Sequence, residues 1–158
     1  MLKTYNRQNA IEYAKIWAKK RNPIFFNFDT LGGDCTNYVS QCIFAGSKVM
    51  NYDTTNGWYY ISPSSRSASW TSTEFLYKFL TTNTKNGPFG KNIPIEQASI
   101  GDIIQFGDEA KFYHSAIVVS TKDDIYLAAH TKDSYMRKLS SYNHPKTRCI
   151  HIEAIRLT

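Results

Sequence analysis

The stretch "LGGDCTNYVSQCIFAG", residues 31–46, decides the fold because it joins a glycine turn to a helix. The apolar positions recur at i, i+3, i+4, i+7 and i+8, the stripe of a helix with one face on a core: Cys35, Tyr38, Val39, Cys42 and Ile43. Asp34 suits the N-cap and Gly46 the C-terminal stop. The sequence therefore predicts a helix whose first turn carries a cysteine.

The remaining elements follow the order helices first, strands later. Apolar spacing predicts a helix over about residues 7–20 with Asn6 as N-cap, and a capping-box spacing from Thr71 to Glu74 predicts a second short helix. Segments rich in Ile and Val predict strands at 100–106, 115–120, 125–130 and 149–157. We expect one α+β domain over residues 1–158, with helices packed on an antiparallel sheet.

Composition restricts the partners. The formal net charge is +6, which favours an anionic partner. The 19 Lys and Arg residues are scattered, with 19–21 the only tight run and no aromatic RNA-binding motif, so we expect no nucleic acid. An anionic cell-wall polymer fits, and the plain alternative is a basic surface that keeps the protein soluble.

Processing signals and cysteine usage add little. Three cysteines are an odd number without paired spacing, which argues against a disulfide framework. No apolar run is long enough to span a membrane, and the first residues lack the apolar core of a signal peptide. We expect a monomer without cofactor or metal that acts at the cell wall or outside the cell, as a domain or after release; the compartment itself stays open.

A cysteine at a helix N-terminus suggests nucleophilic catalysis, because the helix end favours the thiolate. Asp34 opposes this effect, so a base must stand nearby. His114 opens one predicted strand and His130 closes the next, and antiparallel pairing puts the two opposite each other. Cys35 would be the nucleophile, His114 the acid and base, and His130 the group that orients it. A register slip of one residue would turn one ring to the other face.

Other interpretations of these residues stay open. Cys35 could be a small buried hydrophobe, as we assume for Cys42 and Cys149. Asp133 or Asn143 could orient His114 in place of His130, and we expect His144 and His151 to be structural. A zinc site from Cys35, Cys42, His114 and His130 is disfavoured, because Cys-x6-Cys is not a metal-binding spacing.

Three further residues are candidates for substrate binding. Asp34 precedes the cysteine, and Trp58 and Trp70 lie in a long polar and aromatic excursion between residues 47 and 70. Long loops of this kind often carry function. For the two tryptophans, packing in the core is an equal alternative.

Several motifs in order resemble one known family, from about Tyr5 to Ile152. They are "GGDCTNYVSQCIFAG" at 32–46, "GWYY" at 57–60, "SASW" at 67–70, "GDIIQF" at 101–106, "FYHSAIVVS" at 112–120 and "AAHTKD" at 128–133. Together they resemble the putative amidase domain family of Gram-positive bacteria, a papain-like group related to NlpC/P60 and CHAP domains. In that group a cysteine at a helix N-terminus, a histidine at a strand start and a polar residue on the next strand carry catalysis, and Cys35, His114 and His130 match these positions.

The resemblance implies cleavage of an amide bond, most often in peptidoglycan peptides. We therefore expect a cysteine amidase or peptidase that works through a thioester acyl-enzyme. One alternative keeps the same cysteine and histidine but makes the protein an acyltransferase, or a deamidase that attacks glutamine side chains. Another is a catalytically silent wall-binding module that keeps the old cleft for recognition.

Overall fold

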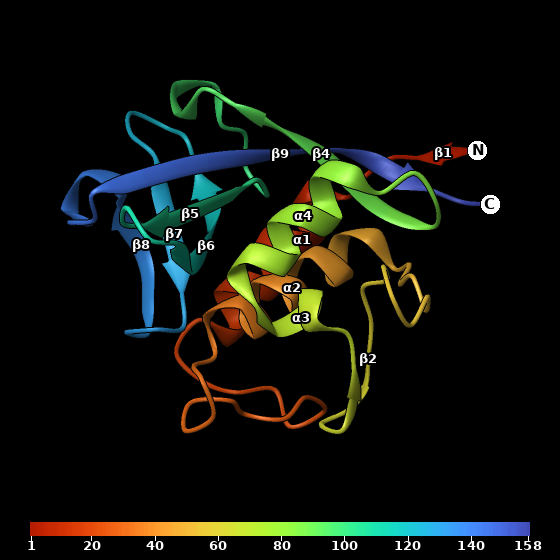
Figure 1. Cartoon of the computed structure of the whole chain (residues 1–158). Coiled ribbons are helices and arrows are strands. Elements are labelled where there is room, and N and C mark those ends of the chain that lie inside the picture. The colour runs from red at the N-terminus through yellow and green to blue at the C-terminus, as the bar shows by residue number, and fades with distance from the viewer.

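A single long strand organises the sheet in the computed structural model, which describes all 158 residues (Figure 1). This strand, β9 (Lys146–Arg156), pairs along one edge with β5 (Ile103–Gly107) and β1 (Leu2–Lys3), and along the other with β4 (Gly87–Ile93). From β5 the sheet continues through β6 (Phe112–Ser120), β7 (Tyr126–Ala129) and β8 (Ser134–Lys138). Every pairing is antiparallel, as expected.

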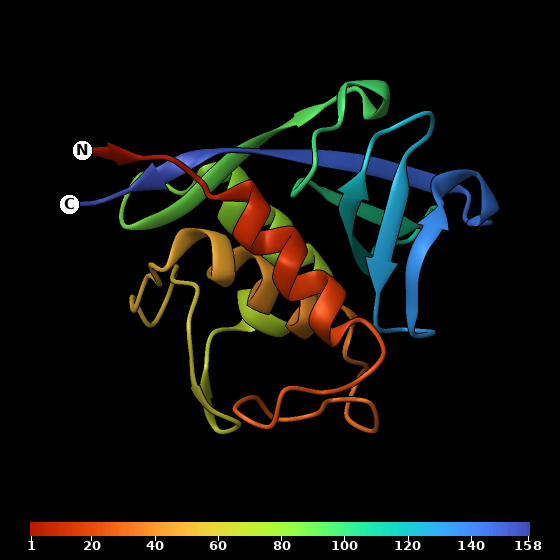
Figure 2. The ribbon, with the colours of Figure 1, turned by 180° about the vertical axis from the view of Figure 1, so that it is seen from behind.

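Three helices pack on one face of this sheet (Figure 2). They are α1 (Arg7–Trp17), α2 (Cys35–Ser47) and α4 (Thr73–Thr82), and the short α3 (Ala68–Thr71) precedes α4. The short strands β2 (Tyr60–Ser62) and β3 (Ser65–Arg66) form a separate hairpin. Turns of 3-10 helix span Ile95–Gln97 and Leu139–Ser141. The α+β class predicted from the sequence is confirmed.

The predicted stripe on α2 lies in the core. Cys35, Tyr38, Val39, Cys42 and Ile43 are all buried, and the last four join the large apolar cluster between helices and sheet. A smaller cluster covers the opposite face of the sheet and includes Ile104, Phe106, Ala116, Val118 and Leu127. Successive residues of β6 therefore serve two different layers, because side chains alternate between the faces of a strand.

The helix ends confirm one of two sequence predictions. The side chain of Asn6 caps α1 by accepting from Asn9 N–H, as predicted. Gly46 does not stop α2, because the helix runs to Ser47 and ends at Lys48 in the left-handed conformation. Gly46 is instead required for space, since a Cβ there would lie 2.5 Å from the Tyr5 ring.

The capping box predicted from Thr71 to Glu74 does not form. Ser72, not Thr71, occupies the N-cap of α4 and makes no side-chain hydrogen bond to it, because the preceding turn forms α3. The sequence reading also missed β4 and β8, whose polar and glycine residues give weak strand signals. No helix combines the length and the hydrophobicity that crossing a bilayer requires.

Candidate active site

Cys35 begins α2 directly after a glycine turn. Gly32 and Gly33 have φ values of +88° and +101°, in the left-handed region that favours glycine, and Gly33 N–H donates to Phe28 C=O at 3.0 Å. A Cβ at either glycine would meet no atom within 4 Å, so the backbone conformation, not crowding, requires glycine here. The turn delivers the thiol to the start of the helix, where backbone N–H groups lack intrahelical partners.

The thiol lines an open cleft. A hollow of about 330 Å³ lies between the turn before α2, the start of α4 and the start of β6: Gly32, Gly33, Cys35, Thr71–Glu74 and Lys111–Tyr113. The Cys35 thiol donates to Tyr113 C=O at 3.9 Å, and Sγ lies 3.8 Å from Thr36 Oγ1. Sγ thus contacts the residue that immediately precedes His114, but no hydrogen bond joins it to an imidazole.

His114 lies on the face of β6 away from α2. Its ring stacks on Phe106 of the small apolar cluster, with centroids 5.7 Å apart, whereas the neighbouring Ser115 points to α2 and lies 3.0 Å from Thr36 Oγ1. Burial and the positive charge of Arg137 lower the pKa of His114 from its ordinary 6.5 to about 4. The ring is therefore neutral at pH 7, the form that can accept a proton.

Thr131, not His130, orients the His114 ring. Strand β7 pairs with β6 so that Ile117 faces Ala128 and Val118 faces Leu127, and the same register continued puts Thr131 opposite His114. Thr131 Oγ1 lies 2.7 Å from His114 Nδ1. When Nδ1–H donates to this hydroxyl, the lone pair of Nε2 is free. The predicted pairing of His114 with His130 was wrong by one residue.

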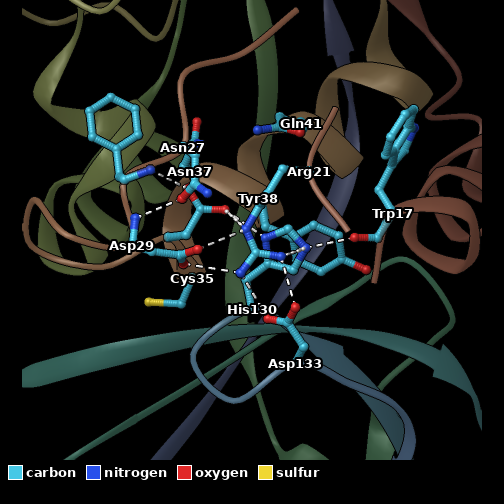
Figure 3. Close-up of polar contacts among 12 residues, drawn as sticks. Trp17, Arg21, Asn27, Asp29, Cys35, Asn37, Tyr38, Gln41, His130 and Asp133 are labelled. Atoms are coloured by element: carbon cyan, nitrogen blue, oxygen red, sulfur yellow. Dashed lines mark hydrogen bonds and ion pairs between the residues drawn. The ribbon is translucent and has the colours of Figure 1, made fainter. Parts of the chain in front are cut away.

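The one-residue offset turns His130 to the helix side of the sheet (Figure 3). His130 Nδ1 lies 2.6 Å from Asp34 Oδ2, Nε2 lies 2.6 Å from Trp17 C=O, and the ring stacks on Tyr38 with centroids 3.9 Å apart. Arg21 Nη1 also lies 3.2 Å from Nε2, so polar groups surround both ring nitrogens. His130 therefore holds the residue before Cys35 and does not touch His114.

Asp34, which we expected to bind substrate, is buried and does not line the cleft of Cys35. The side chain is 1% exposed, and Oδ1 accepts from Phe28 N–H and Asn37 Nδ2, both at 2.9 Å. Burial raises the pKa of this carboxyl, but the hydrogen bonds from His130, Asn37 and Phe28 outweigh it and hold the pKa below its usual value. Asp34 occupies the N-cap position of α2, yet its side chain makes no cap hydrogen bond.

Arg21 closes the outer side of this network (Figure 3). Its guanidinium pairs with Asp29 at 3.0 Å and with Asp133 at 2.9 Å, and its Nε lies 3.4 Å from Asp34. Burial lowers the pKa of Arg21, but Asp133 and Asp29 together have a larger, opposite effect and raise the pKa above its ordinary value. The side chain therefore stays charged. Asp133, which the sequence offered as an alternative group to orient His114, pairs with Arg21 instead.

Trp58 and Trp70 pack in the core and are fully buried, so neither lines an accessible cleft. Trp58 Nε1 donates to Ser40 Oγ at 3.1 Å, and Trp70 Nε1 donates to Asn37 Oδ1 at 3.0 Å. Both partners lie on α2. The tryptophans thus support α2 by packing in the core, the alternative that the sequence left open.

A buried polar seam beneath Cys35 escaped the sequence analysis. Thr36 Oγ1 lies 3.0 Å from Thr73 Oγ1 and 3.0 Å from Ser115 Oγ, and Gln105 Nε2 donates to Thr73 C=O at 3.0 Å. These contacts join α2, α4, β5 and β6 at the cleft. Polar residues inside otherwise apolar helix and strand patterns were the available signal.

The remaining histidines and cysteines lie apart from Cys35. His151 Nδ1 lies 2.8 Å from the buried Asp102, in the structural role predicted. His144 instead stands near His114, with Nδ1 2.8 Å from Tyr113 Oη. Cys42 and Cys149 are fully buried, and burial raises the pKa of each thiol, to about 12 for Cys149. No cluster of three His, Cys, Asp or Glu side chains is placed to hold a metal ion.

Comparison with known proteins identifies a family and a relative for this sequence. A family model described as "Putative amidase domain" matches residues 4–153. The chain is also similar to the "Uncharacterized protein YhbB" of Bacillus subtilis (strain 168), with 36% identity over 140 residues. That alignment covers 84% of this chain and 43% of the relative, so the chain spans under half of the relative's length. No solved structure matches.

Proposed function

Because the chain belongs to the "Putative amidase domain" family, whose description indicates an amidase-type activity, we propose that it is a cysteine amidase. Cys35 is the nucleophile and His114 the general base. One observation carries the proposal: the Cys35 thiol, at the N-terminus of α2, lines an open cleft and donates to the backbone carbonyl that precedes His114.

The proposed reaction proceeds in two halves. His114 Nε2 takes the thiol proton, Cys35 Sγ attacks the amide carbon, and the developing oxyanion lies at the N-terminus of α2, whose free N–H groups and dipole favour negative charge. The protonated His114 then gives its proton to the leaving amine, which leaves a thioester on Cys35. Water activated by the same imidazole hydrolyses the thioester and releases the acid.

The sulfur and imidazole must approach each other for this chemistry. The thiol donates to Tyr113 C=O and the His114 ring packs on the face of β6 away from α2. Proton transfer therefore requires Sγ to leave that carbonyl and the ring to move around the start of β6 toward it. Hydrogen bonds of catalytic pairs are often long without substrate and tighten in the Michaelis complex. Thr131 supports the proposal, because its hydroxyl leaves Nε2 as the proton acceptor.

We propose peptidoglycan peptides as the substrate class and the cell wall as the place of action. The net charge of +6 supports an anionic substrate, because opposite charge favours encounter with an anionic polymer. If an amine replaced water as the acceptor, the protein would be an acyltransferase. If a glutamine side chain were the substrate, the protein would be a deamidase. Product masses distinguish these reactions.

The test is incubation of the protein with purified peptidoglycan and its soluble peptides, followed by mass spectrometry of the released fragments. Hydrolysis adds 18 Da across a cut bond, transfer to an amine acceptor replaces the leaving amine by the acceptor's mass, and deamidation adds about 1 Da. Cys35→Ala should abolish the product, and Cys42→Ala should retain it. A product that persists in Cys35→Ala refutes the cysteine mechanism.

A second measurement follows the thiol directly. Iodoacetamide near neutral pH should label Cys35 at least tenfold faster than Cys42 or Cys149, because Cys35 alone lines an open cleft while the other two are fully buried. His114→Ala should slow that labelling. Equal labelling of the three thiols in the folded protein would favour a binding module with a disused cleft.

A further inference from the structure

A second hollow borders the cleft of Cys35. It has a volume of about 220 Å³ and is lined by Tyr113, His114, Ala129, Thr131, Lys132, Arg137, Tyr142 and His144. We call it the Arg137 pocket. Tyr113 lines both hollows, so they meet at the start of β6. A molecule that extends across Tyr113 would touch Cys35 on one side and the Arg137 pocket on the other.

The Arg137 pocket carries positive charge that the protein does not neutralise. Its lining contains Arg137 and Lys132 but no Asp or Glu, and neither cation forms an ion pair. Arg137 is half-buried and lies over the Tyr142 ring, 3.9 Å from its centroid. An anion bound in the pocket could compensate this charge, because burial of charge is costly unless a partner offsets it.

The Arg137 guanidinium is fixed in place, yet part of it is free to bind. Its Nε donates to Ser141 Oγ at 2.9 Å and its Nη2 to Ser141 C=O at 3.0 Å. Nη1 makes no hydrogen bond within the protein. A guanidinium held on one edge and free on the other is preorganised to donate to an oxygen anion.

The two histidines of the pocket respond to this charge. Burial and then Arg137 lower the pKa of His114, and burial, His114 and Arg137 lower the pKa of His144. Arg137 therefore lies close enough to act on both rings. The groups that face them are Arg137 on β8, Lys132 and Thr131 after β7, and Tyr113 on β6. An anion in the pocket would reduce the positive potential at both imidazoles.

We propose that the Arg137 pocket binds a carboxylate of the substrate, so that the enzyme acts on amides that carry a free carboxylate near the scissile bond. The proposal rests on the proposed function, because it places the reacting carbonyl at Cys35. Arg137 Nη1 and Lys132 Nζ would donate to the carboxylate. A carboxylate suits the site because a planar anion fits the fork of a guanidinium and lies beside aromatic rings.

Binding is tested without turnover in the Cys35→Ser variant. The probe is N-acetylalanine, with N-acetylalanine amide as the neutral match, and the readout is the NMR titration of the imidazole protons of His114 and His144. N-acetylalanine should shift both sets of signals and raise the pKa of His114, whereas the amide should leave them unchanged. Arg137→Gln should abolish the response.

Arg156→Gln is the matched control, because Arg156 also lies 3.9 Å over an aromatic ring and forms no ion pair, but on β9 away from the pocket. It should respond like the parent. Arg137→Lys and Lys132→Gln keep the test decisive if Arg137→Gln fails to fold, and each should weaken binding. Equal shifts from acid and amide, or an undiminished response in every pocket variant, would overturn the proposal.

Turnover gives the second readout. With a pair of substrates that differ only in a carboxylate or a carboxamide beside the cut bond, Arg137→Gln should lower kcat/KM at least tenfold for the acid alone. Arg156→Gln should change neither. Probe binding is measured without catalysis, so the two proposals can fail separately. A protein that binds N-acetylalanine but cuts no substrate would refute the proposed function and support carboxylate binding in the Arg137 pocket. A protein that cuts both substrates equally would support the proposed function and refute carboxylate recognition by the Arg137 pocket.

Discussion

His130 Nδ1 lies 2.6 Å from Asp34 Oδ2, so the end of β7 is joined directly to the residue that precedes Cys35. The pair is almost completely buried, and the other ring nitrogen reaches Trp17 C=O at the end of α1. Three segments distant in sequence therefore fix the start of α2. The Arg21 guanidinium, with Nε 3.4 Å from Asp34 Oδ2, offsets the negative charge of Asp34, which would otherwise oppose a thiolate on the next residue.

Asp34→Ala should destabilise the protein by about 3–5 kcal/mol, the usual cost of removing one partner from a buried charged network, because Arg21 and His130 both lose the carboxylate that they contact. The change also removes acceptors from Phe28 N–H and Asn37 Nδ2. Urea unfolding followed by circular dichroism measures the loss. Asp29→Asn is the control, because that carboxylate pairs with Arg21 near the surface and should cost about 1 kcal/mol or less. Similar losses in the two variants would contradict this account.

Much of the helical layer was predictable, because its signals are local. The stripe from Cys35 to Ile43 and the cap at Asn6 depend only on residues within one helix. The strands richest in Ile and Val were found for the same reason. The end of α2 was not predicted correctly. Position 46 requires glycine because the Tyr5 ring packs against it, and Tyr5 lies 41 positions earlier in the chain.

The site was harder to predict than the fold, because it depends on strand register. Pairing across the turn at 121–124 was predicted one residue away from the register observed, and that offset decides which face receives His130. The sequence predicted that Cys35 lies near His114, and the thiol does contact the residue before His114. The predicted register assigned the role of orienting His114 to the wrong residue. Thr131, next to His130 in the chain, holds the His114 ring instead.

Thr131→Val should lower kcat/KM by about ten- to a hundredfold, by analogy with the loss on removing the hydrogen-bond partner of a metal-bound histidine. Valine matches threonine in shape but cannot hold Nδ1, so both tautomers of His114 become populated. Thr131→Ser keeps a hydroxyl and should retain most of the activity. Fragment release from peptidoglycan measures both variants. A valine variant as active as the serine variant would show that this contact has no role in orienting His114.

His114 should make stability depend on pH between about 6.5 and 4. Its pKa falls from 6.5 to about 4 on folding, so within this window the unfolded chain binds the extra proton and the native protein does not. The free energy of unfolding should therefore decrease as the pH falls, by up to about 3 kcal/mol at 1.4 kcal/mol per pKa unit. Above pH 6.5 this contribution is fully present.

Urea unfolding at pH 7.0, 5.5 and 4.5 measures that slope. The His114→Gln variant removes the titrating group and should show a flatter dependence over the same interval. His144, whose pKa is also lowered, acts in the same direction, so a residual slope should shrink further in the double variant. A slope in His114→Gln equal to that of the parent would show that His114 titrates normally in the folded protein.

Gly33→Ala should destabilise the protein by about 1–2 kcal/mol, because an L-residue at a φ of +101° places its Cβ against its own backbone. Open space surrounds the position, so the cost is conformational alone. D-alanine introduced by chemical ligation has the opposite handedness and should be tolerated or stabilising. Gly46→Ala is the contrasting variant, because the Cβ of L-alanine there meets the Tyr5 ring and should be destabilising through crowding. Thermal unfolding of the four proteins separates strain from crowding, and equal melting temperatures for L- and D-alanine at position 33 would show that the turn before Cys35 is not held in the left-handed conformation.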